Sequence, residues 1–218
     1  MKIQFQKELD RLKKHIVRLG DIVIDNIRDV IQALESLDSE LAEQVISLDL
    51  EVDQREVEIE EECLKLLALY QPVATDLRLV IAVMKINAEL ERIGDEAGNI
   101  AELIEIMAKQ ERTCRSFDYS LMAEKVQYML KICLESLTEG NQALAQKVLR
   151  LDDDVDTAKN RAYRVIFQTV KEKPEHAEYL IHMQRVAHHL ERVADHATNI
   201  AEQVIYLTQG VIVRHMSS

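Results

Sequence analysis

Residues that interrupt helices are scarce in this chain. Among 218 residues there are five glycines, two prolines, three phenylalanines, six tyrosines and no tryptophan. Few glycines and prolines leave long stretches in which a helix can continue unbroken. A hydrophobic fraction of 47% is nevertheless typical of a globular protein with a substantial core. We therefore predict an almost entirely helical fold.

Paired cysteines and long apolar runs are also missing. The three cysteines, Cys63, Cys114 and Cys133, are odd in number and form no CxxC motif, which indicates reduced packing residues. No uncharged apolar run approaches the roughly 18 residues that span a bilayer. The N-terminal sequence has no apolar region of the kind found in signal peptides. We expect a soluble, cytoplasmic protein that does not insert into a membrane.

The charge is strongly one-sided. The chain has 27 basic and 39 acidic residues, a net charge of -12. Such a charge disfavours binding to nucleic acid or to an anionic membrane by bulk attraction. Neither a glycine-rich loop nor a basic cluster is present to hold a phosphate. Cations and basic protein surfaces are the partners that this charge favours.

One fourteen-residue sequence occurs twice. ELERIGDEAGNIAE at 89–102 and HLERVADHATNIAE at 189–202 are identical at nine positions with a constant offset of 100. In both copies apolar residues recur every three or four positions, as on the buried side of a helix. A second likeness, LDLEVD at 48–53 and LDDDVD at 151–156, has an offset of 103. The two halves of the chain are therefore repeats.

Caps and breaks divide each half into three helices. Asp38 or Ser39 suits a helix start, Gly140-Asn141 marks a turn, and Gln71-Pro72 and Lys173-Pro174 interrupt the helical pattern. We predict an all-α fold of two similar, tandem three-helix bundles with six long antiparallel helices, and two domains at 1–112 and 113–218 that meet in the segment 109–117. The tail 209–218 is expected to fray. The expected helices are 9–37, 41–70, 77–107, 121–137, 144–170 and 175–207.

Acidic pairs four residues apart occur on the second and third helix of each half. In an antiparallel hairpin that turns near 71–73, the pair on each helix lies about 20 residues from the turn, so the two pairs reach the same height. The second half repeats this arrangement. Clusters of carboxylate oxygens suit divalent metals. The candidate metal ligands are Asp49, Asp53, Glu91 and Asp95 in the first half, and Asp152, Asp156, Glu191 and Asp195 in the second.

The alternative is that these carboxylates form a solvated face. Gly94 and Gly98 favour a site, because each weakens the helix by about 1 kcal/mol relative to alanine, which suggests that another backbone or a ligand comes close there. Asn99 and Asn199 either add an amide ligand or bond a neighbouring helix. His188 has Ala88 as its counterpart in the repeat, so we expect no role for it in the second cluster. The halves also differ, since Glu56 extends the first acidic stripe whereas Lys159 interrupts the second.

Enzymatic motifs are not found. A di-iron bundle enzyme uses Glu-x-x-His pairs, but Gly94 and Ala194 stand three residues after Glu91 and Glu191. No P-loop, nucleophile elbow or HExxH motif occurs. We predict a protein that is not an enzyme, with a metal store or a carboxylate-metal enzyme as the alternative.

The sequences ERIGDEAGNIAE, ERVADHATNIAEQVIYL and, at 71–86, QPVATDLRLVIAVMKI resemble the PhoU family of bacterial phosphate-uptake regulators over essentially the whole chain. The resemblance implies two three-helix bundles, a homodimer and a cytoplasmic negative regulator of the phosphate regulon. Its partners would be the Pst phosphate ABC transporter, through its ATPase, and the sensor kinase PhoR, which acts on PhoB. The resemblance also implies iron or zinc, rather than magnesium or manganese, at the eight carboxylates named above.

Overall fold

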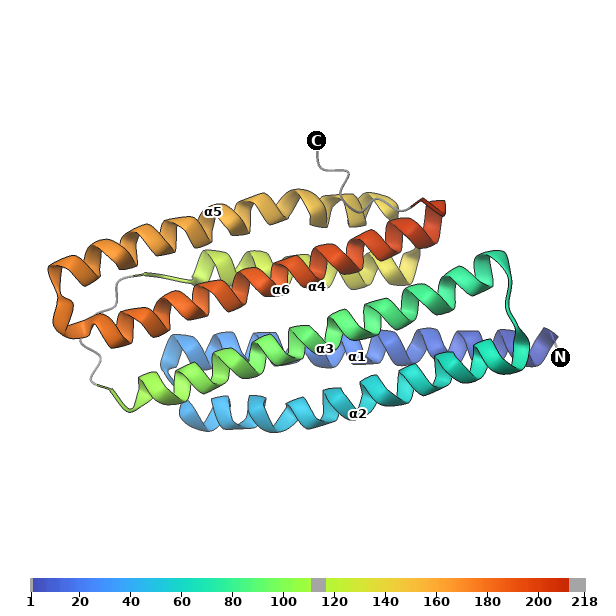
Figure 1. Cartoon of the computed structure of the whole chain (residues 1–218), viewed down its shortest axis with the longest axis horizontal. Coiled ribbons are helices and arrows are strands. Elements are labelled where there is room, and N and C mark those ends of the chain that lie inside the picture. The colour runs from blue at the N-terminus through green and yellow to red at the C-terminus, as the bar shows by residue number, and fades with distance from the viewer. Residues whose placement is uncertain (1, 111–116, 212–218) are drawn as a thin grey trace.

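Six long helices make up a computed structural model of the chain, which describes residues 2–110 and 117–211 (Figure 1). Within these ranges there is no strand, and the all-α prediction is confirmed. No helix there is long and apolar enough to span a bilayer. The elements are α1 (Lys2–Ser36), α2 (Ser39–Tyr70), α3 (Ala74–Ala108), α4 (Ser120–Glu139), α5 (Gln142–Glu172), a 3-10 turn η1 (Pro174–His176) and α6 (Ala177–Gln209).

The predicted breaks lie where the helices end. Asp38 accepts hydrogen bonds from the backbone N–H groups of Glu40 and Leu41 and so caps α2. Gly140 ends α4 in the left-handed region, with a φ of 63°, and Asn141 caps α5 with its side chain. After α5, the proline of Lys173-Pro174 begins η1. Local turn chemistry therefore sets these boundaries.

The start of α1 differs from the prediction. The helix begins at Lys2 instead of residue 9. Residues before Leu9 carry no continuous apolar stripe, so periodicity gave no signal there. The added turns are held by a hydrogen bond from Gln4 to Glu8 and by the ring of Phe5, whose centroid lies 5.0 Å from that of Tyr70.

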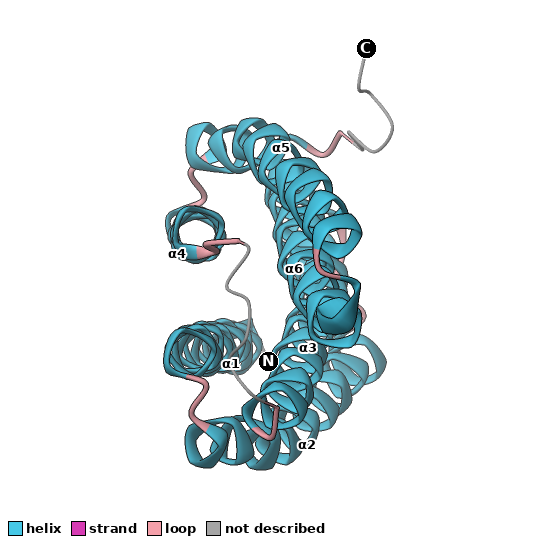
Figure 2. Cartoon of the chain, turned by 90° about the vertical axis from the view of Figure 1, so that its left-hand side faces the viewer, coloured by secondary structure: helices cyan, strands magenta, loops and turns pink. Residues whose placement is uncertain are grey.

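The helices form two layers when the molecule is viewed along its length (Figure 2). One layer is a curved row in the order α5, α6, α3, α2, and α4 and α1 lie side by side along one side of that row. Helices α1 to α3 form one bundle and α4 to α6 the other, joined where α3 packs on α6 and α1 on α4. The buried apolar side chains of both bundles form one continuous core.

The predicted core stripes are buried in both copies of the repeat. In α3 they are Leu90, Ile93, Ala97, Ile100 and Ile104, and in α6 they are Leu190, Val193, Ala197, Ile200 and Val204.

Three sequence predictions involve residues beyond those described. Cys63 and Cys133 are buried free thiols, as expected for packing residues, and Cys114 lies outside the described residues. The predicted domain boundary at 112/113 and most of the tail at 209–218 lie outside them too. Of the tail, Gln209 is the last residue of α6, and Gly210 caps that helix with a φ of 71°.

Candidate metal centres

The first acidic cluster forms between α2 and α3. Asp49 and Asp53 reach across from α2 to Asp95 on α3, and one oxygen of each lies within 4.8 Å of the others. Within residues 2–110 and 117–211, this is the only group of three acidic, histidine or cysteine side chains whose ligand atoms come so close. The acidic pairs of α2 and α3 therefore lie at the same height, as predicted, and three of their four carboxylates come close together.

Unrelieved negative charge marks this cluster. Burial, and then the charges of Asp53 and Asp95, raise the pKa of Asp49 above its ordinary value. Its Oδ1 is buried and has no hydrogen-bond partner. A buried carboxylate oxygen without a donor is costly, and a cation at this place would remove the cost.

The fourth carboxylate, Glu91, takes part through its charge. Burial, Asp95 and Asp53 raise the pKa of Glu91, and Glu56 adds to the repulsion. Burial and Asp53 likewise raise the pKa of Asp95, while His196 and Arg192 across the α3/α6 contact partly oppose the shift. Asp49, Glu91 and Asp95 thus resist full ionisation together, and the charge of Asp53 acts on each of them.

The glycines of α3 allow α2 to come close. A Cβ at Gly94 would lie 3.2 Å from Val52 Cγ1 and 3.4 Å from Asp49 Oδ1, and one at Gly98 would lie 4.0 Å from Asp49 Oδ2. At Gly94 the close approach is made by side chains of α2 rather than by a backbone or a ligand, and at Gly98 the nearest atom is no closer than ordinary contact distance. Small residues on α3 therefore let the carboxylates of α2 face those of α3.

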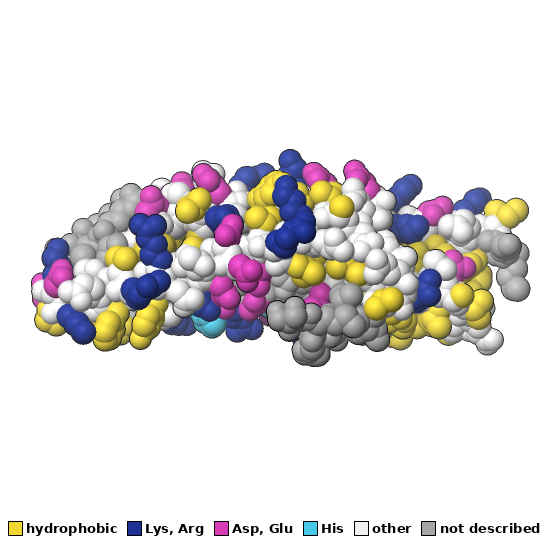
Figure 3. All heavy atoms as spheres, turned by 90° about the horizontal axis from the view of Figure 1, so that it is seen from above, with side chains coloured by type: hydrophobic (Ala, Val, Ile, Leu, Met, Phe, Trp, Pro, Cys, Tyr) yellow, Lys and Arg dark blue, Asp and Glu magenta, His cyan; other side chains and the backbone are white. Residues whose placement is uncertain are grey.

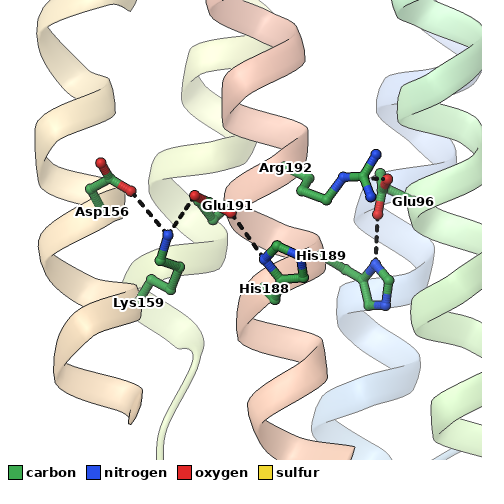
Figure 4. A network of polar contacts seen from close by, with 7 residues as sticks. All are labelled: Glu96, Asp156, Lys159, His188, His189, Glu191 and Arg192. Carbon is green, nitrogen blue, oxygen red and sulfur yellow. Dashed lines mark hydrogen bonds and ion pairs between the residues drawn. The ribbon is translucent and has the colours of Figure 1, made fainter. Parts of the chain in front are cut away.

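In the second half a lysine stands among the carboxylates (Figure 4). The Lys159 Nζ on α5 lies 2.5 Å from Glu191 Oε1 on α6 and 3.5 Å from Asp156 Oδ1. His188 Nδ1 lies 3.2 Å from Glu191 Oε2, one turn away on α6, so this histidine lies beside the cluster, and its absence from the ligand set stays a prediction. The sequence showed Lys159 as an interruption of the stripe but did not show where its ammonium points.

The other two carboxylates of the second half stay crowded. Burial, followed by the charges of Asp195 and Asp156, raises the pKa of Asp152 to about 6. Burial and Glu191 raise the pKa of Asp195, and His196 and Lys159 oppose that shift. Seen from the α5 side, acidic side chains gather near the middle of the molecule beside a histidine, with basic side chains on both sides (Figure 3).

The two clusters differ in how well they suit a metal ion. A buried oxygen without a hydrogen-bond partner occurs in both, Asp49 Oδ1 in the first cluster and Glu191 Oε2 in the second. The first also offers three converging oxygens with no ammonium among them, which fits a divalent cation. Asp49, Asp53 and Asp95 would hold the ion there, and it would supply the positive charge that these side chains lack. The second has an ammonium within ion-pair distance of two of its carboxylates, which does not fit. Occupancy at all eight predicted ligands stays a prediction.

A set of polar contacts between the repeats was not predicted. Glu96, which is buried, lies 2.6 Å from His189 Nδ1 and 3.0 Å from Arg192 Nε (Figure 4). The related contact joins Glu89 to His196 at 2.8 Å. Two glutamates of the first repeat thus face two histidines of the second in an antiparallel α3/α6 contact.

These contacts are made by residues at which the two repeats differ. At each of the two positions, 89/189 and 96/196, the first repeat has a glutamate and the second a histidine. Asn199 also serves this contact, since its Nδ2 donates to Glu89 Oε2 at 3.0 Å. It therefore bonds a neighbouring helix, one of the two alternatives that the sequence left open.

Comparison with known proteins agrees with this architecture. The family model described as "PhoU domain" matches twice, at 16–104 and at 119–204. The chain belongs to the PhoU family. The two matches coincide with the two bundles, so the PhoU domain is the unit that is repeated here.

Relatives from distant bacteria match over nearly the full chain. A phosphate-specific transport system accessory protein PhoU homolog from Aquifex aeolicus is 39% identical, over 96% of this chain and 95% of its own length. One from Pseudomonas aeruginosa is 36% identical, over 98% of this chain and 88% of its own. The crystal structure of PhoU from Pseudomonas aeruginosa superposes with a TM-score of 0.92 and 35% identity, covering 95% of this chain and 100% of that one.

A second solved structure extends the fold to another group of bacteria. The phosphate transport system regulatory protein PhoU from Streptococcus pneumoniae superposes with a TM-score of 0.86 at 28% identity, over 96% of this chain and 99% of that one. The resemblance to PhoU and the fold that it implied are thus confirmed.

Proposed function

We propose that the chain is a cytoplasmic accessory regulator of a phosphate transport system. It couples the Pst phosphate ABC transporter to the sensor kinase PhoR, so that PhoB stays inactive while phosphate is plentiful. The observation that carries the proposal is the extent of the likeness: a relative named as an accessory protein of the phosphate-specific transport system matches 96% of this chain over 95% of its own length.

A role without catalysis is supported by the residues beside the clusters. Asp49, Asp53 and Asp95 supply oxygen ligands and negative charge, which suit a cation. The Glu-x-x-His pairs of di-iron bundle enzymes are replaced here by Glu91 with Gly94 and by Glu191 with Ala194. A metal store or a carboxylate-metal enzyme is the alternative that the first cluster favours. Turnover of common phosphate esters by the metal-loaded protein would support that alternative.

The outer face of α2 supports docking of a protein partner. Leu50, Val57 and Leu64 are seven residues apart and so lie along one line of the helix, and their exposed fractions are 75%, 48% and 52%. Glu51 and Glu58 follow the first two and are exposed. An apolar line with acidic neighbours fits a basic amphipathic helix of a partner. A second copy of the same face would bring like charges together.

The experiment is affinity capture of the tagged chain from its own host, grown with ample phosphate or starved of it. The proposal predicts that PhoR and the Pst ATPase are recovered and that the kinase-controlled genes stay silent with ample phosphate. The triple variant Leu50→Gln, Val57→Thr, Leu64→Gln changes exposed positions only. It should fail to capture at least one of the two partners, PhoR or the Pst ATPase. Its control is Leu121→Gln with Ile181→Gln, which are exposed at 59% and 55% on α4 and α6.

Each outcome has a clear meaning. If the parent captures neither partner under either condition, the regulatory role is wrong. If it captures both and the triple variant does too, the outer face of α2 is not the docking surface. Formation of a homodimer, which the family resemblance implies, stays a prediction that sedimentation of the same preparations tests.

A further inference from the structure

We propose that the Lys159 ammonium takes the place of the metal ion in the second half, so that of the two acidic clusters only that of Asp49, Asp53 and Asp95 binds metal. The inference concerns ligand chemistry alone, and it holds or fails independently of the transport role. It differs from what the family resemblance implies, which is metal at the carboxylates of both repeats.

The geometry of Lys159 carries the first step. Its side chain is 27% exposed, and its Nζ bridges the two helices that supply the cluster, 2.5 Å from Glu191 Oε1 and 3.5 Å from Asp156 Oδ1 (Figure 4). The Lys159 ammonium donates a hydrogen bond to Glu191 and a second, longer one to Asp156. Helices α5 and α6 thus contribute both the carboxylates and their counter-charge.

The repeat carries the second step. With the offset of 103 that relates α2 to α5, position 159 corresponds to position 56, which is glutamate. Where the positive Lys159 attracts Glu191, the negative Glu56 faces a carboxylate of like charge, Glu91. The backbone oxygen of Glu56 accepts a hydrogen bond from the buried Asn87 at 2.8 Å, which ties this turn of α2 to α3. At this position of the repeat the second half has a lysine where the first has a glutamate, and the lysine gives the second cluster a cation of its own.

Electrostatics makes the two cations exclusive. A divalent ion bound by Glu191 and Asp156 would lie within a few ångströms of the ammonium, and like charges that close repel strongly when partly shielded from water. The ammonium would have to leave and both of its ion pairs would be lost. In the first half an ion displaces no ammonium, and Asp49, Asp53 and Asp95 converge to receive it.

Separate substitutions of Lys159 and Glu56 test the inference. The full chain is stripped with EDTA and titrated with Zn²⁺ alone and then with Mn²⁺ alone, and bound ions per chain are counted by native mass spectrometry and calorimetry. We expect one ion per chain in the parent, two in Lys159→Met, and two in Lys159→Glu, which rebuilds the first-half pattern. Glu56→Lys should weaken the remaining site by about 10- to 100-fold, the range found when groups beside metal ligands are changed.

Helical circular dichroism checks the fold of each variant, and Lys159→Met serves if Lys159→Glu does not fold. Lys125→Met is the matched control, because Lys125 on α4 pairs with Asp154 on α5, 2.6 Å apart, outside the cluster. It should keep one ion. A parent that binds two ions or none, or a Lys159→Met variant with the same count as the parent, would overturn the inference.

Discussion

At the scale of single residues, the two halves use the same carboxylates in different surroundings. Asp49, Asp53 and Asp95 face one another without a basic side chain among them, whereas Lys159 is paired with Glu191 and Asp156 in the second half. Helical spacing alone predicted that the carboxylates converge, because residues four apart share a face. Spacing does not specify where a long lysine side chain points, so the pairing had to come from the structure.

Neutralising Asp95 should remove the response of the protein to metal. We expect a divalent ion at a hundred times its dissociation constant to stabilise the parent by about 2.7 kcal/mol. Asp95→Asn should lose most of this gain, and without metal it should be as stable as the parent or more so, because burial and Asp53 already oppose its charge. Thermal unfolding with Zn²⁺ and with EDTA measures both effects. Asp195→Asn is the control and should keep the gain; a full response from Asp95→Asn would make the cluster a solvated face.

Protonation of Asp152 should make the metal-free protein more stable in mild acid than at neutral pH. Its pKa of about 6 in the fold lies above its ordinary value of 3.8, so the folded state binds the proton more tightly than the unfolded state does. This contribution is fully present below the ordinary value and is lost as pH rises through 6. Asp152→Asn, which is neutral throughout, should exceed the parent in melting temperature at pH 7 by more than at pH 4.5. A difference that does not change with pH would contradict the assignment.

At the scale of helices, boundaries with their own chemistry were predictable and contacts between helices were not. Helix ends could be predicted from capping residues such as Asp38, Gly140 and Asn141, because a cap acts on backbone groups within a few residues. Nothing local announces that α3 packs against α6, because both helices show the same buried stripe toward their own bundle. The partner helices become apparent only when Glu96 is seen beside His189 and Arg192.

The contact between α1 and α4 depends on a glycine. A Cβ at Gly20 would lie 2.5 Å from Leu134 Cδ1 and 3.1 Å from its Cγ. Gly20→Val should therefore overpack this contact and destabilise the protein by about 1–3 kcal/mol. Adding Leu134→Ala should recover part of the loss, so the two changes together cost less than the sum of each alone. Urea unfolding of the four proteins in this cycle measures the coupling, and strictly additive losses would contradict a direct contact.

At the scale of the whole molecule, the repeats behave as one body. Their cores merge, and Glu96 on α3 meets His189 and Arg192 on α6 in a mostly buried contact. We therefore expect a single unfolding transition in spite of the two domains that the sequence shows. The repeat predicted two bundles, but a joint core follows from side chains that differ between the copies.

The contact between the repeats can be weakened at one position. Glu96→Gln keeps the size of a buried side chain and removes the charge that faces His189 and Arg192. We expect a loss of about 1.5–3 kcal/mol, the range for hydrogen bonds to charged groups. The exposed Glu124→Gln is the control and should stay within about 0.5 kcal/mol of the parent. Urea unfolding followed by circular dichroism should show both bundles shifting together; two separate transitions would contradict the joint core.

The measurement that tests the account most directly is an anomalous-scattering experiment on crystals of the zinc-loaded protein at the zinc absorption edge. It gives the position of the metal directly, and it compares the two clusters in the same molecule under the same conditions. The account predicts an anomalous peak between Asp49, Asp53 and Asp95, with the Lys159 ammonium still beside Glu191 in the second half. A peak among Asp152, Asp156, Glu191 and Asp195, or none at the first cluster, would contradict it.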